Sequence, residues 1–201
     1  MKIYLTRHGQ TQWNLKGRIQ GSLDSDLTDK GIEDALKLSK KLESINFDIA
    51  YTSIQNRAIE TAKIILNNKV DIVKLYELNE IGVGNWEGMT YDDIISNYPE
   101  QFDKYKKSPH LYVPDNGGET YQVFENRVRK FVEILRDNSK DKKNILIVTH
   151  GLTYLMLLNI FEGKELQNLS KRTIPLGTSL SIIEYKNDIF NILVEGDSSH
   201  L

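Results

Sequence analysis

Two histidines of this chain stand in the same sequence context. His8 follows an apolar run at residues 3–7, His150 follows another at residues 145–149, and a glycine comes next in both places. If both runs are parallel strands of an α/β sheet, they end at the same edge, where such sheets bind ligands, and the two imidazoles face one crevice. A single histidine of this kind more often caps a strand end. The matched pair favours a shared site in which an imidazole acts as a nucleophile or as a general acid or base.

Two arginines can supply an anion site beside these histidines. Arg7 directly precedes His8, and its planar guanidinium suits a bidentate contact with phosphate or carboxylate. Arg57 lies one turn into a helix expected over residues 56–66, for which Ser53 is the expected N-cap. The positive end of that helix would point to the same crevice. Together these groups predict a site for an oxyanion, above all a dianionic phosphate.

The residue types exclude several reactions and favour one. The chain has no cysteine, which excludes thiol nucleophiles, disulfides and zinc–thiolate sites. No metal-ligand spacing of histidines or carboxylates occurs either, so neither a metal nor a cofactor is expected. An imidazole can attack phosphorus directly to form a phosphohistidine. The leaving alkoxide then needs a proton, which a carboxyl group can supply if burial and nearby negative charge raise its pKa. Glu77, Glu80 and Glu87 have suitable surroundings, and their spacing does not choose among them.

Apolar, β-branched runs alternate with amphipathic stretches along most of the chain. This alternation predicts an α/β fold, a three-layer sandwich with a mainly parallel sheet and helices on both faces. The expected strands are residues 3–6, 48–52, 70–75 and 144–149, and the expected helices are residues 29–42, 56–66, 119–136 and 153–161. Residues 179–185 and 189–194 flank a polar turn and predict a C-terminal antiparallel hairpin at the edge of the sheet.

One segment interrupts the alternation. Residues 77–121 are rich in Gly, Pro, Tyr and acidic residues, and they contain only short helical stretches at residues 90–98 and 100–107. Such an insertion is typical of a lid over the crevice at the strand ends. The chain of 201 residues is therefore interpreted as a single domain, 1–201, with a small lid insertion.

Composition and charge limit the partners. The chain has 39% hydrophobic and 27% charged residues, the mix of a globular protein. No apolar run approaches the ~20 residues that span a bilayer, and the N-terminus turns polar at Thr6, too early for a signal peptide. We therefore expect a cytoplasmic protein without a membrane partner. The net charge of −2 argues against nucleic acid as a partner. The sequence leaves the oligomeric state open, a homodimer included.

A series of motifs resembles, in order, those of the histidine phosphatase superfamily, the phosphoglycerate mutase-like proteins. The motifs are Arg7-His8-Gly9-Gln10-Thr11-Gln12-Trp13-Asn14, Gln20-Gly21, Leu27-Thr28-Asp29-Lys30-Gly31, Thr52-Ser53 through Arg57-Ala58 and Thr61-Ala62, Glu80 through Trp86-Glu87-Gly88, Gly118-Glu119 through Arg127, and Thr149-His150-Gly151. One Arg-His-Gly would be weak evidence. The ordered series extends over essentially the whole chain and is a specific resemblance.

The resemblance implies roles for individual residues. His8 would be the nucleophile that becomes phosphorylated, while Arg7, Arg57 and His150 would hold the phosphoryl oxygens. Glu80 matches the family's proton donor, which would protonate the leaving oxygen and later deprotonate the attacking water.

Further hydrogen bonds around the same phosphate are implied for a second group of residues. These residues are Asn14, Gln20, Gly21 and Gly151. Trp86 and Glu87 are interpreted as structural supports of the loop that carries Glu80.

The superfamily contains both phosphatases and mutases, and the lid segment favours a phosphatase. A bisphosphoglycerate-dependent mutase must hold a carboxylate and a second phosphate under its lid, which calls for extra basic side chains. No arginine occurs between Arg57 and Arg127, and residues 77–120 contain nine acidic residues against three lysines. We therefore expect a metal-independent phosphoric monoester hydrolase that acts on a small phosphorylated metabolite, with phosphoglycerate mutase as the alternative.

Two other interpretations are weaker. Asp24 to Thr28 match the Asp-x-Asp-x-Thr pattern of magnesium-dependent haloacid dehalogenase-type phosphatases, but that chemistry needs the aspartates at the end of an apolar strand, and here a turn-rich stretch precedes them. A non-catalytic module that binds phosphorylated ligands would lack part of the catalytic set, whereas His8, Glu80 and His150 are all present.

Two further histidines lie outside this set. The terminal Ser199-His200-Leu201 resembles the endings of several small phosphatases of the superfamily, in which the tail can fold over the active site, and a frayed tail is the equal alternative. His110 lies in the candidate lid, where a surface position is favoured over a contact with substrate.

Overall fold

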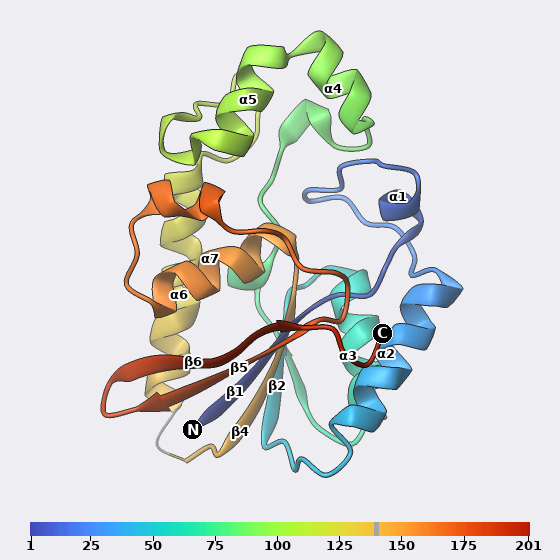
Figure 1. The fold of residues 1–201 in the computed structure, drawn as a ribbon, viewed down its shortest axis with the longest axis vertical. Helices are drawn as coiled ribbons and strands as arrows, with labels where there is room; N and C mark the ends of the chain where they lie inside the picture. Colours follow the sequence, from blue (N-terminus) through green and yellow to red (C-terminus); the bar gives the residue numbers. More distant parts are fainter. Residues whose placement is uncertain (139–140) are drawn as a thin grey trace.

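The computed structural model describes residues 1–138 and 141–201, whose strands form one six-stranded sheet with the order β3-β2-β4-β1-β5-β6 (Figure 1). The strands are β1 (Lys2–Arg7), β2 (Ile49–Thr52), β3 (Ile72–Lys74), β4 (Asn144–Thr149), β5 (Leu180–Lys186) and β6 (Ile189–Asp197). Strands β1 to β4 are parallel, and β5 and β6 add antiparallel at one edge. The mainly parallel sheet and its edge hairpin, as expected from the sequence, are confirmed.

The helices surround this sheet. The α-helices are α1 (Gln12–Leu15), α2 (Asp29–Lys41), α3 (Asn56–Leu66), α4 (Tyr91–Asn97), α5 (Pro99–Lys107), α6 (Tyr121–Asp137) and α7 (Gly151–Phe161). Short 3-10 helices are η1 (Tyr76–Leu78), η2 (Gly84–Trp86), η3 (Pro109–Leu111) and η5 (Leu166–Lys171). Helix α3 and strand β4 have the expected bounds, whereas α1 and η5 are too short to show a periodic pattern and were not expected. Within the described part of the chain, no helix is long and apolar enough to cross a membrane.

Strands β1, β2 and β4 are buried on both faces because their apolar residues alternate between two cores. In β1, Ile3 and Leu5 share one core with residues of α6 and α7, while Tyr4 shares the other with residues of α2 and α3. The two helix pairs accordingly lie on opposite sides of the sheet (Figure 1). This arrangement is the three-layer α/β sandwich that the alternating pattern predicts.

The pairing of β1 with β4 places the two His-Gly sequences side by side at the ends of adjacent strands. Arg7 pairs with Thr149 at the ends of the strands, and the His8 N–H donates to the Thr149 carbonyl oxygen at 2.8 Å. His150 is the next residue after β4. Both imidazoles therefore leave the sheet at its carboxyl edge.

Residues 77–121 lie beyond this edge, with α4 and α5 at the far end of the molecule (Figure 1). Their packing is aromatic: the fully buried ring of Trp86 lies 5.9 Å from the ring of Tyr98 and 5.8 Å from that of Tyr105. This cluster gives the segment its own small apolar centre, which holds the two short helices over the strand ends.

Candidate active site

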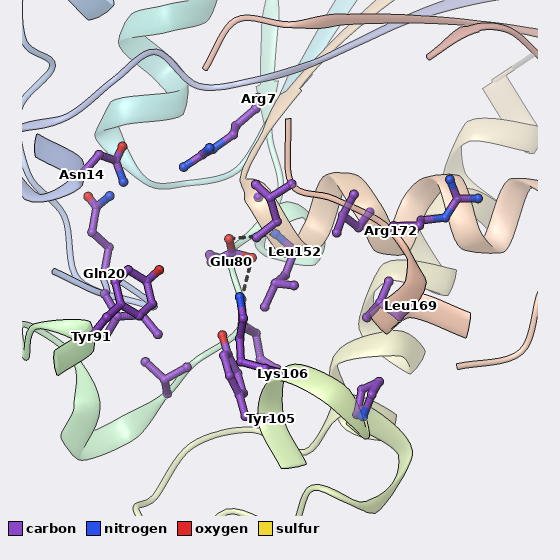
Figure 2. A pocket seen from close by; sticks show the side chains of 18 of the residues that line it. Arg7, Asn14, Gln20, Glu80, Tyr91, Tyr105, Lys106, Leu152, Leu169 and Arg172 are labelled. Carbon is purple, nitrogen blue, oxygen red and sulfur yellow. Dashed lines mark hydrogen bonds between the residues drawn. The ribbon is translucent and has the colours of Figure 1, made fainter. Parts of the chain in front are cut away.

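A cavity of about 410 Å³ opens between the carboxyl edge of the sheet and the segment 77–121 (Figure 2). Most of the residues expected at the site line this cavity. They are Arg7, His8, Asn14, Gln20, Gly21, Arg57, Glu80 and Gly151. His150 is the exception, because it is fully buried and is not part of the lining.

His8 is held in one tautomer at the wall of the cavity. Its side chain is buried, and Nδ1–H donates to the Gly9 carbonyl oxygen at 2.7 Å. Burial, reinforced by the Arg57 and Arg7 guanidinium groups, holds the pKa of His8 well below its usual value. The ring is therefore neutral near pH 7, and its lone pair is on Nε2.

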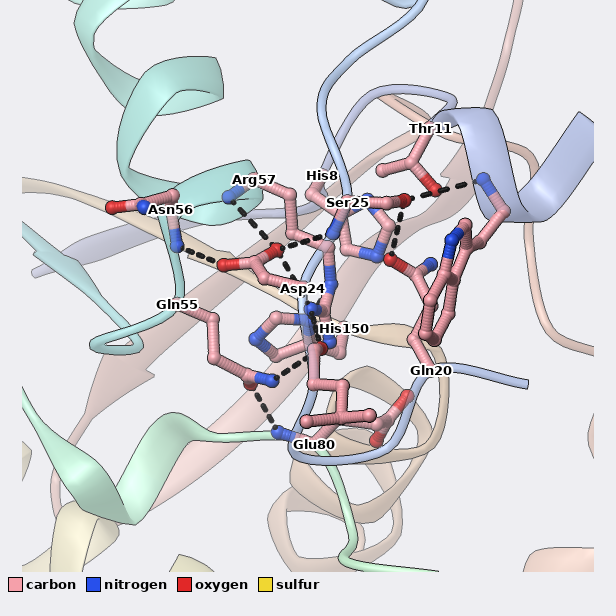
Figure 3. A network of polar contacts seen from close by, with 12 residues as sticks. His8, Thr11, Gln20, Asp24, Ser25, Gln55, Asn56, Arg57, Glu80 and His150 are labelled. Carbon is pink, nitrogen blue, oxygen red and sulfur yellow. Dashed lines mark hydrogen bonds and ion pairs between the residues drawn. The ribbon is translucent and has the colours of Figure 1, made fainter. Parts of the chain in front are cut away.

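His150 lies next to His8 and Arg57 (Figure 3). Its ring centroid lies 5.1 Å from that of His8. Nδ1 accepts Nε–H of Arg57 at 3.1 Å, and Nε2–H donates to Ser53 Oγ at 2.7 Å. Burial and the Arg57 charge hold the pKa of His150 well below its usual value, so this ring is also neutral. Both ring nitrogens are thus used to fix neighbouring side chains.

Arg57 is fixed at the start of α3 by the loop that precedes α2. Nη1 donates to the Leu23 carbonyl oxygen at 2.6 Å and to Asp24 Oδ1 at 2.9 Å, and Nη2 donates to the Gly21 carbonyl oxygen at 3.1 Å. The guanidinium is 1% exposed. Its plane is therefore set by protein groups on several sides.

The expectation that Ser53 caps α3 is wrong. The N-cap is Gln55, and its side chain makes no capping bond. The hydroxyl of Ser53 instead accepts the Gln55 N–H and the proton of His150. The Asp24 carboxylate accepts the N–H of Asn56 at 2.5 Å and places its negative charge at the helix N-terminus (Figure 3).

Arg7 reaches the cavity from the end of β1 (Figure 2). Nη1 donates to the Pro175 carbonyl oxygen at 2.9 Å, while Nε is buried without a hydrogen-bond partner in residues 1–138 and 141–201. Burial lowers the pKa of Arg7, and Glu80 and Tyr91 oppose that shift. A partly buried guanidinium at the wall of a cavity is suited to holding an anion.

Of the three acidic residues left open by their spacing, only Glu80 lines the cavity. Its carboxylate accepts the N–H groups of Leu152 at 3.0 Å and Thr153 at 3.2 Å, at the N-terminus of α7. Glu87 instead supports the backbone, because Oε1 accepts the N–H groups of Ser22 at 2.8 Å and Val83 at 3.2 Å.

The turn at Gln20 and Gly21 brings backbone close to the cavity. Gly21 has a φ of +53°, in the left-handed region that favours glycine, so the turn depends on this residue. Gln20 Oε1 accepts the Ser25 hydroxyl at 3.1 Å. Asn14 Oδ1 accepts the Thr11 N–H at 3.1 Å, which leaves its amide nitrogen on the cavity side of α1 (Figure 2).

Beyond these polar groups, the cavity has a wall that the sequence analysis did not identify. It is formed largely by Ile81, Val83, Tyr91, Tyr105, Tyr121, Leu152, Leu155, Leu169 and Ile174. The abundance of tyrosine in residues 77–121 is a partial signal for this wall, since side chains of an insertion over the site must face it. Leu169 and Ile174 carry no such signal. Asp24 is the first aspartate of the Asp-x-Asp-x-Thr pattern, and the structure places it in a loop, not at the end of a strand.

The C-terminal tail lies on α2 and outside the cavity lining. Lys41 forms an ion pair with Asp197 and donates to Ser199 Oγ at 2.8 Å. His200 Nε2 donates to the Thr178 carbonyl oxygen at 3.1 Å. The tail therefore contacts α2 and Thr178 and does not line the cavity. His110 is exposed and also lies outside the cavity lining. No cluster of three His, Asp or Glu side chains in the described residues is arranged to hold a metal ion.

Known proteins resemble this chain in both sequence and fold. It is 34% identical to phosphoserine phosphatase 1 of Hydrogenobacter thermophilus over 151 residues, 75% of this chain and 71% of that protein. It is 29% identical to the 2,3-bisphosphoglycerate-dependent phosphoglycerate mutase of Bartonella tribocorum over 181 residues, 87% of this chain and 88% of that protein. The fold matches Bacillus stearothermophilus YhfR with a TM-score of 0.93 at 40% identity, covering 99% of this chain and 98% of that one. The family model of the histidine phosphatase superfamily (branch 1) matches residues 3–198, and the chain therefore belongs to that superfamily.

Proposed function

We propose that this protein is a phosphatase that hydrolyses small phosphomonoesters through a phosphohistidine on His8, with Glu80 as the proton donor. The observation that carries the proposal is a neutral, buried imidazole at the wall of a cavity that two arginines also line. A neutral imidazole offers a lone pair for attack, and guanidinium groups stabilise the charge that develops on the phosphoryl oxygens.

The first step transfers the phosphoryl group to the enzyme. Nε2 of His8 forms a bond to phosphorus while the bond from phosphorus to the ester oxygen breaks. Arg7 and Arg57 bind the non-bridging oxygens, and His150 keeps the Arg57 guanidinium in place through its Nδ1 contact. The ester oxygen leaves with the bonding electron pair and takes a proton from the Glu80 carboxyl group.

The second step releases inorganic phosphate. Water attacks phosphorus and gives a proton to the Glu80 carboxylate, and the bond between phosphorus and His8 Nε2 breaks with its electron pair returning to the imidazole. Glu80 therefore serves first as an acid and then as a base.

The character of the cavity supports hydrolysis over mutase chemistry. Past the phosphate end, the lining is largely apolar or aromatic, and its cations are Arg18, Lys106 and Arg172. Arg18 donates to the Gly88 carbonyl oxygen, and Arg172 is paired with Glu162 and Glu195, so two of the three cations are already engaged. A mutase that holds a bisphosphate needs more free positive charge than this. The phosphoserine phosphatase relative supports the same choice.

The test is release of phosphate from p-nitrophenyl phosphate in excess EDTA. We expect wild type to turn over and His8→Ala to lose about 10³-fold or more of kcat. His110→Ala is the matched control, because this histidine is exposed and lies outside the cavity lining. It should retain wild-type activity.

Two results would contradict the proposal. Turnover that EDTA abolishes would rule out the metal-independent route. Interconversion of 3- and 2-phosphoglycerate in the presence of 2,3-bisphosphoglycerate, at a rate well above phosphate release, would identify a mutase.

A further inference from the structure

We propose that Arg127, on α6, positions Glu80 for proton transfer by holding the backbone of the loop that carries it. This inference rests on the proposed role of Glu80 as proton donor. Arg127 is not part of the cavity lining, so it acts through this loop and is a positioning residue.

The Arg127 guanidinium is buried against the inner side of the loop and donates to several converging carbonyl oxygens. Nη1 donates to those of Tyr76, Glu77 and Asn79 at 3.1, 3.2 and 2.9 Å. Nη2 donates to that of Glu80 at 3.3 Å. One side chain therefore binds four carbonyls within residues 76–80.

Arginine suits this place for a physical reason. The loop begins with η1, a single helical turn whose last carbonyls have no partner within the helix. Converging carbonyls repel one another, and a cation at a helix C-terminus offsets that repulsion. In the rigid plane of the guanidinium, Nη1 shares its two N–H groups among three of the carbonyls and Nη2 reaches the fourth. The single ammonium group of lysine cannot reproduce this arrangement.

Glu119 fixes Arg127 and extends the contact along the loop. Its carboxylate accepts Nε–H at 3.1 Å and Nη2–H at 2.7 Å, and Oε2 also accepts the Gly82 N–H at 2.9 Å. The pair therefore binds the loop on both sides of Glu80. The Arg127 and Glu119 side chains are only 8% and 19% exposed, so each charge needs a partner of opposite sign. The ion pair between them supplies it.

Side chains of two other elements also bind this loop. The Glu80 N–H donates to Gln55 Oε1 at 3.0 Å, and Thr153 Oγ1 donates to the Asn79 carbonyl oxygen at 2.8 Å. Arg127 binds Glu80 at its carbonyl oxygen. Releasing it would let the Glu80 backbone shift, and a displacement of about 1 Å at a reacting group is enough to cost up to about 10²-fold in rate.

Leaving-group dependence separates this role from a general contribution to folding. p-Nitrophenyl phosphate releases a stable anion and depends little on a proton donor, whereas O-phosphoserine releases an alkoxide and depends on it strongly. We expect Arg127→Lys to lower kcat/KM for O-phosphoserine by about 30-fold or more, and for p-nitrophenyl phosphate by less than about threefold. Glu80→Gln should show the same selectivity, and Arg127→Lys should add nothing in that background.

Arg129→Lys is the matched control. Arg129 lies on the same helix and is 47% exposed, and its hydrogen bonds and ion pair in the described residues go to Glu125. It should leave both substrates unaffected. If Arg127→Lys does not fold, as judged by circular dichroism, Glu119→Gln loosens the same guanidinium and supplies the same comparison.

The outcomes distinguish the inference from the proposed function. Equal losses on both substrates in Arg127→Lys, beside a selective loss in Glu80→Gln, would overturn the positioning role and leave the proposed function intact. Equal losses on both substrates in Glu80→Gln would overturn the proton-donor role, and the positioning role with it.

Discussion

Arg57 and His150 are joined by one buried hydrogen bond, in which Arg57 Nε–H donates to His150 Nδ1 at 3.1 Å. Because this nitrogen accepts, the neutral ring carries its proton on Nε2, which donates to Ser53 Oγ. Arg57 therefore selects the tautomer of His150, and Ser53 accepts the proton that this tautomer carries on Nε2. The same contact with His150 helps to set the plane of the Arg57 guanidinium at the cavity. The side chain that faces the cavity is Arg57, and the histidine lies behind it.

Ser53→Ala should lower both the stability and the activity of the protein. The change leaves the buried Nε2–H of His150 without an acceptor, which costs about 1–3 kcal/mol. We expect the free energy of unfolding in urea to fall by this amount and kcat/KM to fall with it. Ser96→Ala, on the exposed face of α4, is the control and should change neither. An unchanged Ser53→Ala protein would show that His150 does not depend on this acceptor.

Arg57→Lys should reduce catalysis without unfolding the protein. Lysine keeps the charge but cannot bind His150 and the Gly21 carbonyl oxygen in one plane, as Arg57 does. We expect kcat/KM for p-nitrophenyl phosphate to fall about 10²–10³-fold, the usual loss for a donor to a developing oxyanion. Lys63→Arg, a surface change on the same helix, should have no effect. A loss of less than about threefold in Arg57→Lys would rule out a direct role in binding the phosphoryl group.

Stability should fall as pH is lowered through the range in which free histidine titrates. The pKa values of His8 and His150 are held well below 6.5 by burial and by the Arg57 charge. Above pH 6.5 both the folded and unfolded chains carry these rings neutral. Below it the unfolded chain takes up protons that the folded chain does not, so the free energy of unfolding decreases by up to about 1.4 kcal/mol per pH unit for each ring.

Urea titrations between pH 7 and 5.5 measure this slope. His8→Asn should reduce it because one of the two rings is removed, whereas the exposed His110→Asn should leave it unchanged. Equal slopes in wild type and His8→Asn would contradict the lowered pKa of His8.

Removing residues 198–201 should leave KM unchanged within about twofold, because the tail contacts α2 and Thr178 and does not line the cavity. The deletion also removes the Ser199 contact of Lys41, whose ion pair with Asp197 is partly exposed. Such surface contacts contribute about 0.2–1 kcal/mol, so thermal denaturation should show a small decrease in Tm. A KM raised several-fold would show that the tail reaches the substrate.

The elements that hold the two histidines follow from local patterns in the sequence. Strand β4 and helix α3 have the expected bounds, because a buried run that is mostly β-branched and a clear 3.6-residue period are strong signals. The meeting of His8 with His150 follows from the rule that parallel strands share a carboxyl edge. The sheet topology alone was enough to predict that His8 and His150 meet, without knowledge of any contact between side chains.

The side chains behind the site follow from no local pattern. Asp24 reaches Arg57 because a loop folds back over α3, and Ser53 meets His150 across two strands. Arg127 binds carbonyls about fifty residues earlier in the chain. Such contacts depend on three-dimensional packing, so the sequence motifs could name Arg127 but could not say what it binds.

The most direct test of the proposed function is to trap the phosphorylated enzyme. Wild type mixed with excess p-nitrophenyl phosphate is quenched in alkaline denaturant within the first turnovers, digested with trypsin and analysed by mass spectrometry. The expected result is a phosphoryl group on His8, in the peptide of residues 8–16, and none in wild type left without substrate. Phosphate on another residue, or full turnover with no phosphorylated peptide, would contradict a phosphohistidine route through His8.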